Sequence, residues 1–198
     1  MEPARRGLET YHDLLAGPGI DRGLIGPREA DRLWDRHILN CAVVADPRLG
    51  LIPGATSVAD VGSGAGLPGL VWAIARPDIQ CVLVEPLLRR ATFLTEALGV
   101  LALGDRVRVE RGRAEDLLRT GWAPVGVATA RAVAPLAKLA SWTLPLVAPN
   151  GVLLALKGAS AQEEIDASGL ARARVVLCGE GVVEPPTTVV VVPAAQSP

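Results

Sequence analysis

A short glycine-rich loop, placed directly after an apolar run, constrains this chain more than any other feature. The apolar run at 57–61 leads into Gly62-Ser-Gly-Ala-Gly-Leu-Pro-Gly69, which has four glycines in eight residues. Glycine allows positive φ angles and lets the backbone approach a ligand closely. A helix that starts after such a loop offers free N–H groups to a polar ligand. The loop therefore predicts an α/β domain with a ligand site at this turn.

Short apolar runs and helix-like segments alternate from this loop onward. We expect strands at 58–61, 80–85, 106–111, 125–129, 151–157, 174–178 and 188–192, and helices at 68–76, 87–98, 114–119, 135–147 and 161–168. Such alternation is typical of a mostly parallel sheet with helices on both faces. The last two strands lie close together in sequence, so we expect an antiparallel end to a seven-stranded sheet.

The first 50 residues have a different character. We expect helices at 8–15 and 28–44, joined by a Gly- and Pro-rich connection at 17–27. The total length of 198 residues suits one domain of ordinary size. We therefore expect an N-terminal helical extension, 1–50, packed on a core domain, 51–198, within a single globular unit.

Charge and cysteine content exclude several classes of protein. The formal net charge is −1, so a non-specific coat for nucleic acid is not expected, although 89–131 holds eight arginines against five acidic residues. Three scattered cysteines suit a reducing compartment. The sequence has neither a signal-peptide pattern nor an apolar run of membrane-spanning length. His37 has no metal-ligating partner nearby in the sequence, and His12 is remote from it, so we expect no metal site. We expect a cytoplasmic monomer that binds neither membrane nor metal.

The glycines of the loop fit two ligand templates. Asp60-x-Gly-x-Gly-x-Gly66 suits S-adenosylmethionine, and Gly64-x-Gly-x-x-Gly69 suits a dinucleotide. The second predicted strand ends at Glu85, whose carboxylate can accept hydrogen bonds from the ribose of either ligand. Asp60 would repel a pyrophosphate but can orient a methionine ammonium, and 113–116 follows the third strand, where an adenine edge would lie. We therefore expect S-adenosylmethionine, with an NAD(P)-dependent oxidoreductase as the alternative.

Further motifs follow the loop in an order and spacing that fit together. They are Glu85-Pro-Leu-Leu-Arg-Arg-Ala-Thr-Phe-Leu94, Arg113-Ala-Glu115, Ala130-Arg-Ala-Val-Ala134 and Ala155-Leu-Lys-Gly158, with Arg36-His-Ile-Leu39 before the first strand. With Asp60-Val-Gly-Ser-Gly-Ala-Gly-Leu-Pro-Gly69, this set resembles the bacterial 16S ribosomal RNA guanine-N7 methyltransferases of the glucose-inhibited division protein B type. The resemblance spans roughly residues 11–192.

The resemblance implies a Rossmann-like class I fold and a cofactor site built from residues spread along the chain. Together with the template above, it assigns S-adenosylmethionine binding to Asp60, Gly62, Gly64, Gly66, Leu67, Glu85, Ala114, Glu115 and Arg131. The acceptor would be 16S ribosomal RNA or the 30S subunit. Candidate RNA contacts are Arg131, Lys157 and His37. Guanine N7 carries a free lone pair, so the reaction requires no general base and we assign no catalytic residue.

The chain departs from the family pattern at three places outside the cofactor motifs, one of which is the Gly- and Pro-rich segment 17–27 in place of an aromatic-rich helix end. Asn40-Cys41 stands where the family usually has Asp-Ser, and Thr187 begins the last strand where a basic residue is usual. These changes concern RNA docking. Two further interpretations remain open beside the oxidoreductase: a methyltransferase with another acceptor, and a non-catalytic RNA-binding module with a degenerate cofactor pocket.

Overall fold

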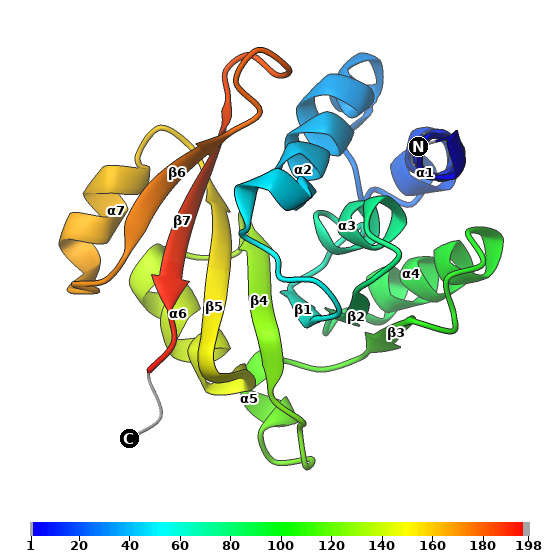
Figure 1. The fold of residues 1–198 in the computed structure, drawn as a ribbon. Helices are drawn as coiled ribbons and strands as arrows, with labels where there is room; N and C mark the ends of the chain where they lie inside the picture. The colour runs from blue at the N-terminus through cyan, green and yellow to red at the C-terminus, as the bar shows by residue number, and fades with distance from the viewer. Residues whose placement is uncertain (1, 196–198) are drawn as a thin grey trace.

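The computed structural model describes residues 2–195 and contains one mixed seven-stranded sheet (Figure 1). The strand order is β3-β2-β1-β4-β5-β7-β6. Neighbours from β3 to β5 are parallel, and β7 runs antiparallel to both β5 and β6. The strands are β1 Ser57–Val61, β2 Gln80–Val84, β3 Val107–Glu110, β4 Val125–Arg131, β5 Val147–Lys157, β6 Arg174–Cys178 and β7 Thr187–Pro193. The predicted mostly parallel sheet with an antiparallel end is confirmed.

Helices cover both faces of this sheet (Figure 1). They are α1 Glu2–Leu14, α2 Asn40–Ala42, α3 Gly69–Ala75, α4 Leu88–Val100, α5 Ala114–Leu117, α6 Leu136–Thr143 and α7 Ala161–Ser168. Alternate strand residues face opposite ways, so Val58 joins the core beneath α3 and α4, whereas Ala59 joins the core beneath α6 and α7. The N-terminal segment lies on the α3 and α4 face. None of the helices described is long and apolar enough to cross a membrane.

The N-terminal helices differ from the expected ones. The first begins at Glu2 rather than at residue 8, because the polar first turns are stabilised by ion pairs between Arg6 and Glu2 and between Arg5 and Glu9. Part of the expected 17–27 connection is helical too, since a wide turn at Leu15–Gly19 continues α1. Pro18 inside that turn has no N–H to donate, which suits a wide turn better than an α-helix.

The expected single helix at 28–44 is wrong. The segment consists of a 3-10 stretch at Pro27–Arg32, a wide π-type stretch at Leu33–Leu39, then α2 and a 3-10 turn at Val43–Ala45. The backbone leaves helical geometry at Arg32, where φ is −120° and ψ is 4°. An apolar periodicity reports which face is buried, and it does not distinguish among helical pitches.

The boundaries around α6 and β5 also shift. The helix expected over 135–147 ends at Thr143, and a 3-10 turn with Pro145 follows. Strand β5 then begins at Val147 rather than at residue 151, with a bend in which Asn150 has a φ of +63°. A register shift against β4 accompanies the bend. Turn-forming residues at 149–151 suggested a loop, but pairing with β4 makes them part of a bulged strand.

The N-terminal segment shares its hydrophobic core with the sheet. Tyr11, Leu33 and Ile38 are fully buried in the same cluster as Leu70 and Trp72 of α3. The indole of Trp72 donates a 2.9 Å hydrogen bond to the Cys41 carbonyl. Residues from the start of the chain are therefore packed directly behind the glycine loop.

Candidate active site

The candidate site lies at the carboxyl ends of the parallel strands. Strand β1 pairs with β2 on one side and with β4 on the other, so the chain connections diverge at this point. Open α/β sheets bind ligands outside the strand ends at such a switch point. The glycine loop leaves β1 here, Glu85 follows β2, and Arg131 ends β4. The fold thus gathers sequence-distant site candidates at one edge.

The glycine loop adopts a backbone that requires glycine. The φ angles of Gly62, Gly64 and Gly66 are +70°, +62° and +103°. A Cβ on Gly62 would lie 2.9 Å from Cγ2 of Val133, and one on Gly66 would lie 2.4 Å from Cδ1 of Leu70. These close approaches come from the loop after β4 and from α3. The loop is therefore held tightly on both sides, with its conformation set by glycine.

Residues on either side of the loop fix its position. The hydroxyl of Tyr11, in α1, donates a 2.8 Å hydrogen bond to the Ala65 carbonyl. Leu67 is buried in the main core, where it anchors the end of the loop before α3. Tyr11 was not among the residues selected from the sequence. Nothing local marks it, because its partner lies 54 positions away.

Asp60 lies fully buried beneath the loop. Its Oδ2 accepts hydrogen bonds from the Ser63 hydroxyl, at 2.6 Å, and from the Gly69 N–H, at 3.0 Å. Its Oδ1 has no hydrogen-bond partner within residues 2–195. Burial raises the pKa of Asp60 from 3.8 to about 6, although these hydrogen bonds and the charge of Arg131 oppose the rise. Asp60 thus fastens the loop with one oxygen and has the other available.

Glu85 connects the glycine loop to the turn after β2. Its Oε2 accepts a 2.9 Å hydrogen bond from the Gly64 N–H, and its Oε1 accepts one of the same length from the Leu87 N–H. The side chain is buried, with Arg90 3.9 Å away. Each carboxylate oxygen can accept a second hydrogen bond. The geometry places Glu85 against the loop, and its role in recognising a ribose stays a prediction.

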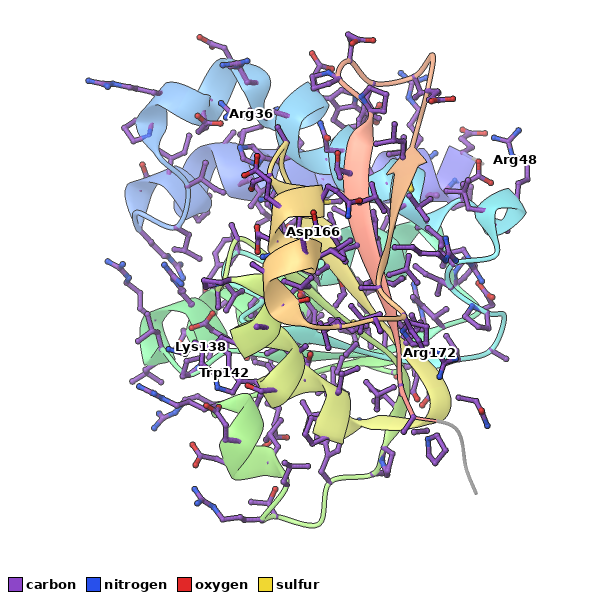
Figure 2. The ribbon with its side chains drawn as sticks, turned by 90° about the vertical axis from the view of Figure 1, so that its left-hand side faces the viewer. Arg36, Arg48, Lys138, Trp142, Asp166 and Arg172 are labelled. Carbon is purple, nitrogen blue, oxygen red and sulfur yellow. The ribbon has the colours of Figure 1, made fainter. Side chains whose placement is uncertain are left out.

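A small apolar cavity of about 170 Å³ opens beside the loop. It is lined by Val61, Gly62, Val84, Pro86, Gly112, Arg113, Ala114, Glu115, Val133 and Trp142. The expected adenine-side residues, Ala114 and Glu115, therefore meet Gly62 across this slot. Trp142 was not selected from the sequence; it comes from α6, with the ammonium of Lys138 5.0 Å from its ring centroid (Figure 2). Flat apolar walls of this kind suit a purine ring.

Arg131 and His37, both candidate RNA contacts, lie in direct contact. The Arg131 Nη1 is 3.0 Å from His37 Nδ1, and His37 Nε2 is 2.9 Å from Glu29 Oε2. Burial and the charge of Arg131 lower the pKa of His37 below 6.5, against the opposing effect of Glu29. The structure brings these two residues together across 94 positions of sequence.

Lys157 is held by protein acceptors. Its ammonium donates 2.7 Å hydrogen bonds to the Ala134 carbonyl and to Oε2 of Glu164 in α7. Glu164 also accepts a hydrogen bond from the Leu136 N–H. An ammonium has three N–H donors, so one remains for a ligand. Lys157 thus holds the loop between β4 and α6, and it also lines a large cleft beside the N-terminal segment.

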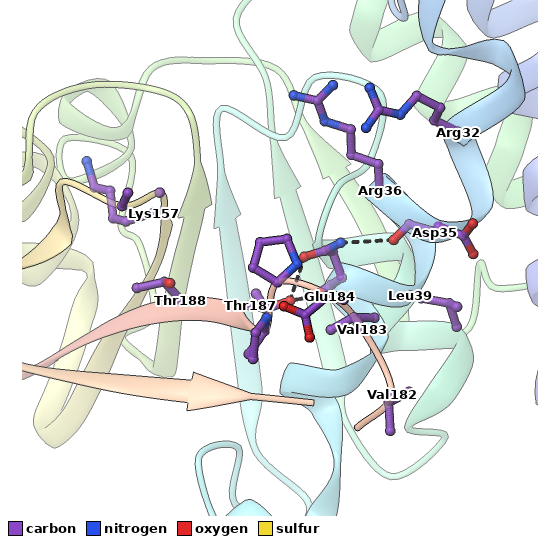
Figure 3. Close-up of a pocket in the computed structure, with 15 residues that line it drawn as sticks. Arg32, Asp35, Arg36, Leu39, Lys157, Val182, Val183, Glu184, Thr187 and Thr188 are labelled. Atoms are coloured by element: carbon purple, nitrogen blue, oxygen red, sulfur yellow. Dashed lines mark hydrogen bonds between the residues drawn. The ribbon is translucent and has the colours of Figure 1, made fainter. Parts of the chain in front are cut away.

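A cleft of about 930 Å³ opens between the N-terminal segment and the β6–β7 connection (Figure 3). Arg32 and Arg36 extend from the N-terminal side, and Lys157 lies across the opening at the end of β5. Thr187 contributes to the other wall, where its hydroxyl lies 2.7 Å from Asn40 Oδ1. The cleft is larger than the slot beside the glycine loop, and polar groups make up a greater share of its lining.

A known protein family and several of its members match most of this chain. The chain matches the family model GidB, described as rRNA small subunit methyltransferase G, over residues 4–177. It is 56% identical to the ribosomal RNA small subunit methyltransferase G of Salinispora tropica over 192 residues, which cover 91% of this chain and 78% of that protein. The protein of the same name from Streptomyces coelicolor is 51% identical over 195 residues, which cover 95% of this chain and 79% of that protein.

Solved structures at low sequence identity share the fold. The O-methyltransferase TomG of Streptomyces achromogenes, in complex with SAM, matches with a TM-score of 0.54 at 16% identity, covering 81% of this chain and 90% of that one. The tRNA methyltransferase TrmK of B. subtilis matches with a TM-score of 0.55 at 13% identity, covering 82% of this chain and 67% of that one. The class I fold expected from the sequence is confirmed, and the oxidoreductase alternative is not favoured. The chain belongs to the rRNA small subunit methyltransferase G family and is an S-adenosylmethionine-dependent methyltransferase.

Proposed function

We propose that this protein transfers the methyl group of S-adenosylmethionine to N7 of a guanine in 16S ribosomal RNA. The observation that carries the proposal is the adjacency of two unlike sites at one edge of the sheet. The slot beside the glycine loop is small and apolar, and the cleft at the same edge is large, with three basic and two acidic side chains in its lining. A donor nucleoside suits the first site and an RNA strand suits the second.

The residues present fit S-adenosylmethionine. The unpartnered Oδ1 of Asp60 suits a cationic or water-mediated ligand group, and the carboxylate of Glu85 suits a ribose diol. The other residues that we propose to hold the cofactor are Gly62, Gly64, Gly66, Leu67, Ala114, Glu115 and Arg131. When bound, S-adenosylmethionine supplies an electrophilic methyl group on a sulfonium. The protein contributes binding, orientation and the exclusion of water.

Positioning supplies the catalysis in this proposal. Guanine N7 has an in-plane lone pair and no proton, so this chain needs no residue to remove one. Holding two reactants in near-attack geometry lowers the barrier by several kcal/mol. Arg131 lies at the end of β4, between the slot and the N-terminal segment, where its guanidinium can orient either reactant.

The cleft suits an RNA segment with an unstacked base. Sequence-specific proteins recognise RNA mainly at single-stranded loops and ends, whose bases can leave the stack. Arg32, Arg36 and Lys157 border the cleft and offer phosphate contacts, with His37 next to Arg36. With a formal net charge of −1, contact with RNA depends on this local patch. We therefore propose 16S RNA, alone or in the 30S subunit, as the partner.

The reaction is tested by transfer of labelled methyl from S-adenosylmethionine to 30S subunits and to naked 16S RNA, followed by nucleoside analysis. We expect label in 7-methylguanosine. The matched control replaces Glu85 with Gln, which keeps the side-chain shape and removes the charge. Label in another nucleoside would overturn the guanine-N7 assignment, and transfer to neither RNA would overturn the acceptor assignment.

We also propose that residues 1–50 form an extension of a methyltransferase domain at 51–198, and that the protein is a monomer. The shared core and the bonds from Tyr11 and Trp72 support the first statement. The monomer is tested by light scattering after size exclusion. A mass near 20.6 kDa is expected, and twice that value would show a dimer.

A further inference from the structure

We propose that His37 is a positioning residue, which holds the Arg131 guanidinium at the mouth of the methyl-donor site through hydrogen bonds that begin at Glu29. The inference rests on the proposed function in one respect: it takes the end of β4 as part of the methyl-transfer site. It assigns His37 a role that acts through Arg131, in place of direct contact with RNA.

The hydrogen-bond chain fixes the tautomer of the imidazole. A guanidinium has only donors, so the nitrogen of His37 that faces it must be an acceptor. His37 Nδ1, 3.0 Å from Arg131 Nη1, is therefore unprotonated, and Nε2 carries the proton that it donates to Glu29 across 2.9 Å. Glu29, a carboxylate on the N-terminal segment, thereby sets the orientation of a side chain at the end of β4.

Arg131 is well placed for such control. It stands two positions before Val133, the residue that closes over Gly62 of the glycine loop. Within residues 2–195, His37 is the only hydrogen-bond partner of its guanidinium. The remaining N–H groups are available to the cofactor or to the guanine. Without His37, the Arg131 side chain would lose its only hydrogen-bonded restraint and sample more rotamers.

Burial, together with the charges of Arg131 and Arg36, lowers the pKa of His37 and favours the neutral ring. Arg131 on β4 and Arg36 on the N-terminal segment disfavour a second proton, whereas Glu29 favours it. Burial disfavours it further, and together these effects leave the pKa of His37 below 6.5. A doubly protonated ring would have no lone pair for Arg131 and would repel it. The contact therefore exists above the His37 pKa and is lost as pH falls through it.

Two substitutions separate the two ring nitrogens. His37→Asn places an amide near Nδ1 and keeps an acceptor for Arg131, whereas His37→Gln places its amide near Nε2 and keeps only the contact with Glu29. We expect kcat/KM on 30S subunits to fall about 10-fold further for His37→Gln than for His37→Asn, since a hydrogen bond to a charged group is lost. Thermal unfolding of both variants controls for damage to the fold.

The pH profile gives a second readout that a structural role would not change. We expect an acidic limb in the wild-type profile that is reduced in His37→Asn, which cannot titrate. Asp60 titrates in the same range, with a pKa of about 6, and contributes to the acidic limb of both proteins. The contribution of His37 is therefore the difference between the wild-type and the His37→Asn profiles. Equal activities of the Asn and Gln variants, or identical acidic limbs, would overturn the proposal.

Nitrogen-15 NMR of the imidazole tests the contact without any turnover. The chain has two histidines, so the signals that disappear in His12→Gln belong to His12 and the remaining ones belong to His37. We expect the Nε2–H tautomer for His37. In Arg131→Gln we expect the titration midpoint of His37 to rise, because a neighbouring cation is removed. An Nδ1–H tautomer or an unchanged midpoint would overturn the proposal. If this contact is present but wild type methylates neither 30S subunits nor 16S RNA, the proposed acceptor fails independently of the His37 contact.

Discussion

Asp60 is a carboxyl group whose titration is shifted mainly by burial, with a smaller contribution from the charge of Glu85. It is fully buried, and its pKa is raised from 3.8 to about 6. A group with a raised folded-state pKa contributes stability that is fully present below its unfolded pKa and is lost as pH rises through its folded pKa. Between about pH 4 and pH 6, the ligand-free protein should therefore lose stability as this carboxyl ionises.

The substitution Asp60→Asn tests this dependence. Asparagine keeps an oxygen for Ser63 and Gly69 but carries no charge. We expect the free energy of unfolding of the variant, relative to wild type, to increase from pH 3 to pH 7 by about 3 kcal/mol, the equivalent of the pKa shift. Denaturant titrations across this pH range give the difference. A constant difference would show that Asp60 does not titrate with a raised pKa.

Gly62 combines a left-handed backbone with a close neighbour. Its φ is +70°, and a Cβ there would lie 2.9 Å from Val133 Cγ2. We expect Gly62→Ala to lower stability by about 1–2 kcal/mol and to weaken S-adenosylmethionine binding about 10-fold, because Val133 lines the donor slot. Calorimetry measures the affinity.

A matched control and a double variant separate the two causes. Gly104→Ala adds the same methyl group where no atom lies within 4 Å, so it should change neither the stability nor the affinity for S-adenosylmethionine. Adding Val133→Ala to Gly62→Ala should restore part of the affinity, because it removes the steric conflict but not the backbone strain. Wild-type affinity in Gly62→Ala itself would contradict the expected role of the loop.

Sequence motifs predict individual residues best when the relevant geometry is local. The glycine loop and Glu85 could be selected because a strand end, a turn and the next strand end specify them together. The partners Tyr11 and Ala65, or His37 and Arg131, are 54 and 94 positions apart. No periodicity in the chain encodes such pairs. The proposed roles of the site residues therefore stay predictions, although the structure places those side chains at one edge.

At the scale of elements, strands proved more predictable than the N-terminal helices. Short apolar runs bounded by turn residues identify strands, and sheet pairing then extends β4 and β5 beyond their apolar segments. The pitch of the segment at 27–45 depends on how it packs against α1 and α3, which local propensity does not report. The buried face of that segment, including Ile38, still matches its apolar positions.

Two of the departures from the family pattern, at Asn40 and Thr187, lie in contact in the structure. Thr187, which begins β7, has its hydroxyl 2.9 Å from the Asn40 carbonyl oxygen and 2.7 Å from Asn40 Oδ1. Asn40 also donates a 2.9 Å hydrogen bond to the Asp35 carbonyl. A neutral contact thus joins the N-terminal segment to β7 at the wall of the cleft, where the family pattern places an acidic and a basic residue.

This contact can be tested by one substitution. Thr187→Val keeps the β-branched shape and removes the hydroxyl, so we expect a loss of about 1 kcal/mol in the free energy of unfolding. The apparent KM for 30S subunits should rise while the affinity for S-adenosylmethionine is unchanged, because the contact borders the cleft and not the slot. Thr188→Val, one residue later, is the control. An equal effect of both substitutions would argue against a specific role for the Asn40 contact.

At the scale of the whole molecule, Arg76 holds the connection before β1 against the end of α3. Its guanidinium is almost fully buried and makes two 2.7 Å hydrogen bonds to Asp78. It also donates to the carbonyls of Ala45 and Ile52, at 3.4 Å and 3.2 Å. One side chain therefore joins the end of α3 to the connection that precedes β1.

Replacing Arg76 should loosen that connection. We expect Arg76→Met to lower the free energy of unfolding by about 2–3 kcal/mol, because several carbonyl and carboxylate acceptors lose their donor. Arg76→Lys should recover only part of the lost stability, since a lysine ammonium cannot reproduce the planar, two-pronged hydrogen bonding of the guanidinium. Urea denaturation measures both. The control is Arg48→Met, which removes the ion pair of an exposed arginine. Equal losses of stability in the two Met variants would show that Arg76 contributes no more than an exposed arginine does.

The reversed direction of β7 has a consequence for how the protein is made. Because β7 runs against β5, its first residue lies at the same edge as the carboxyl ends of the parallel strands. The cleft therefore has one wall from residues 32–40 and the other from residues 182–188. A ribosome synthesises the donor slot, complete by Trp142, well before the second wall. The nascent chain would thus acquire the proposed donor slot first, and would gain the second wall of the proposed RNA cleft only after residues 182–188 have been made.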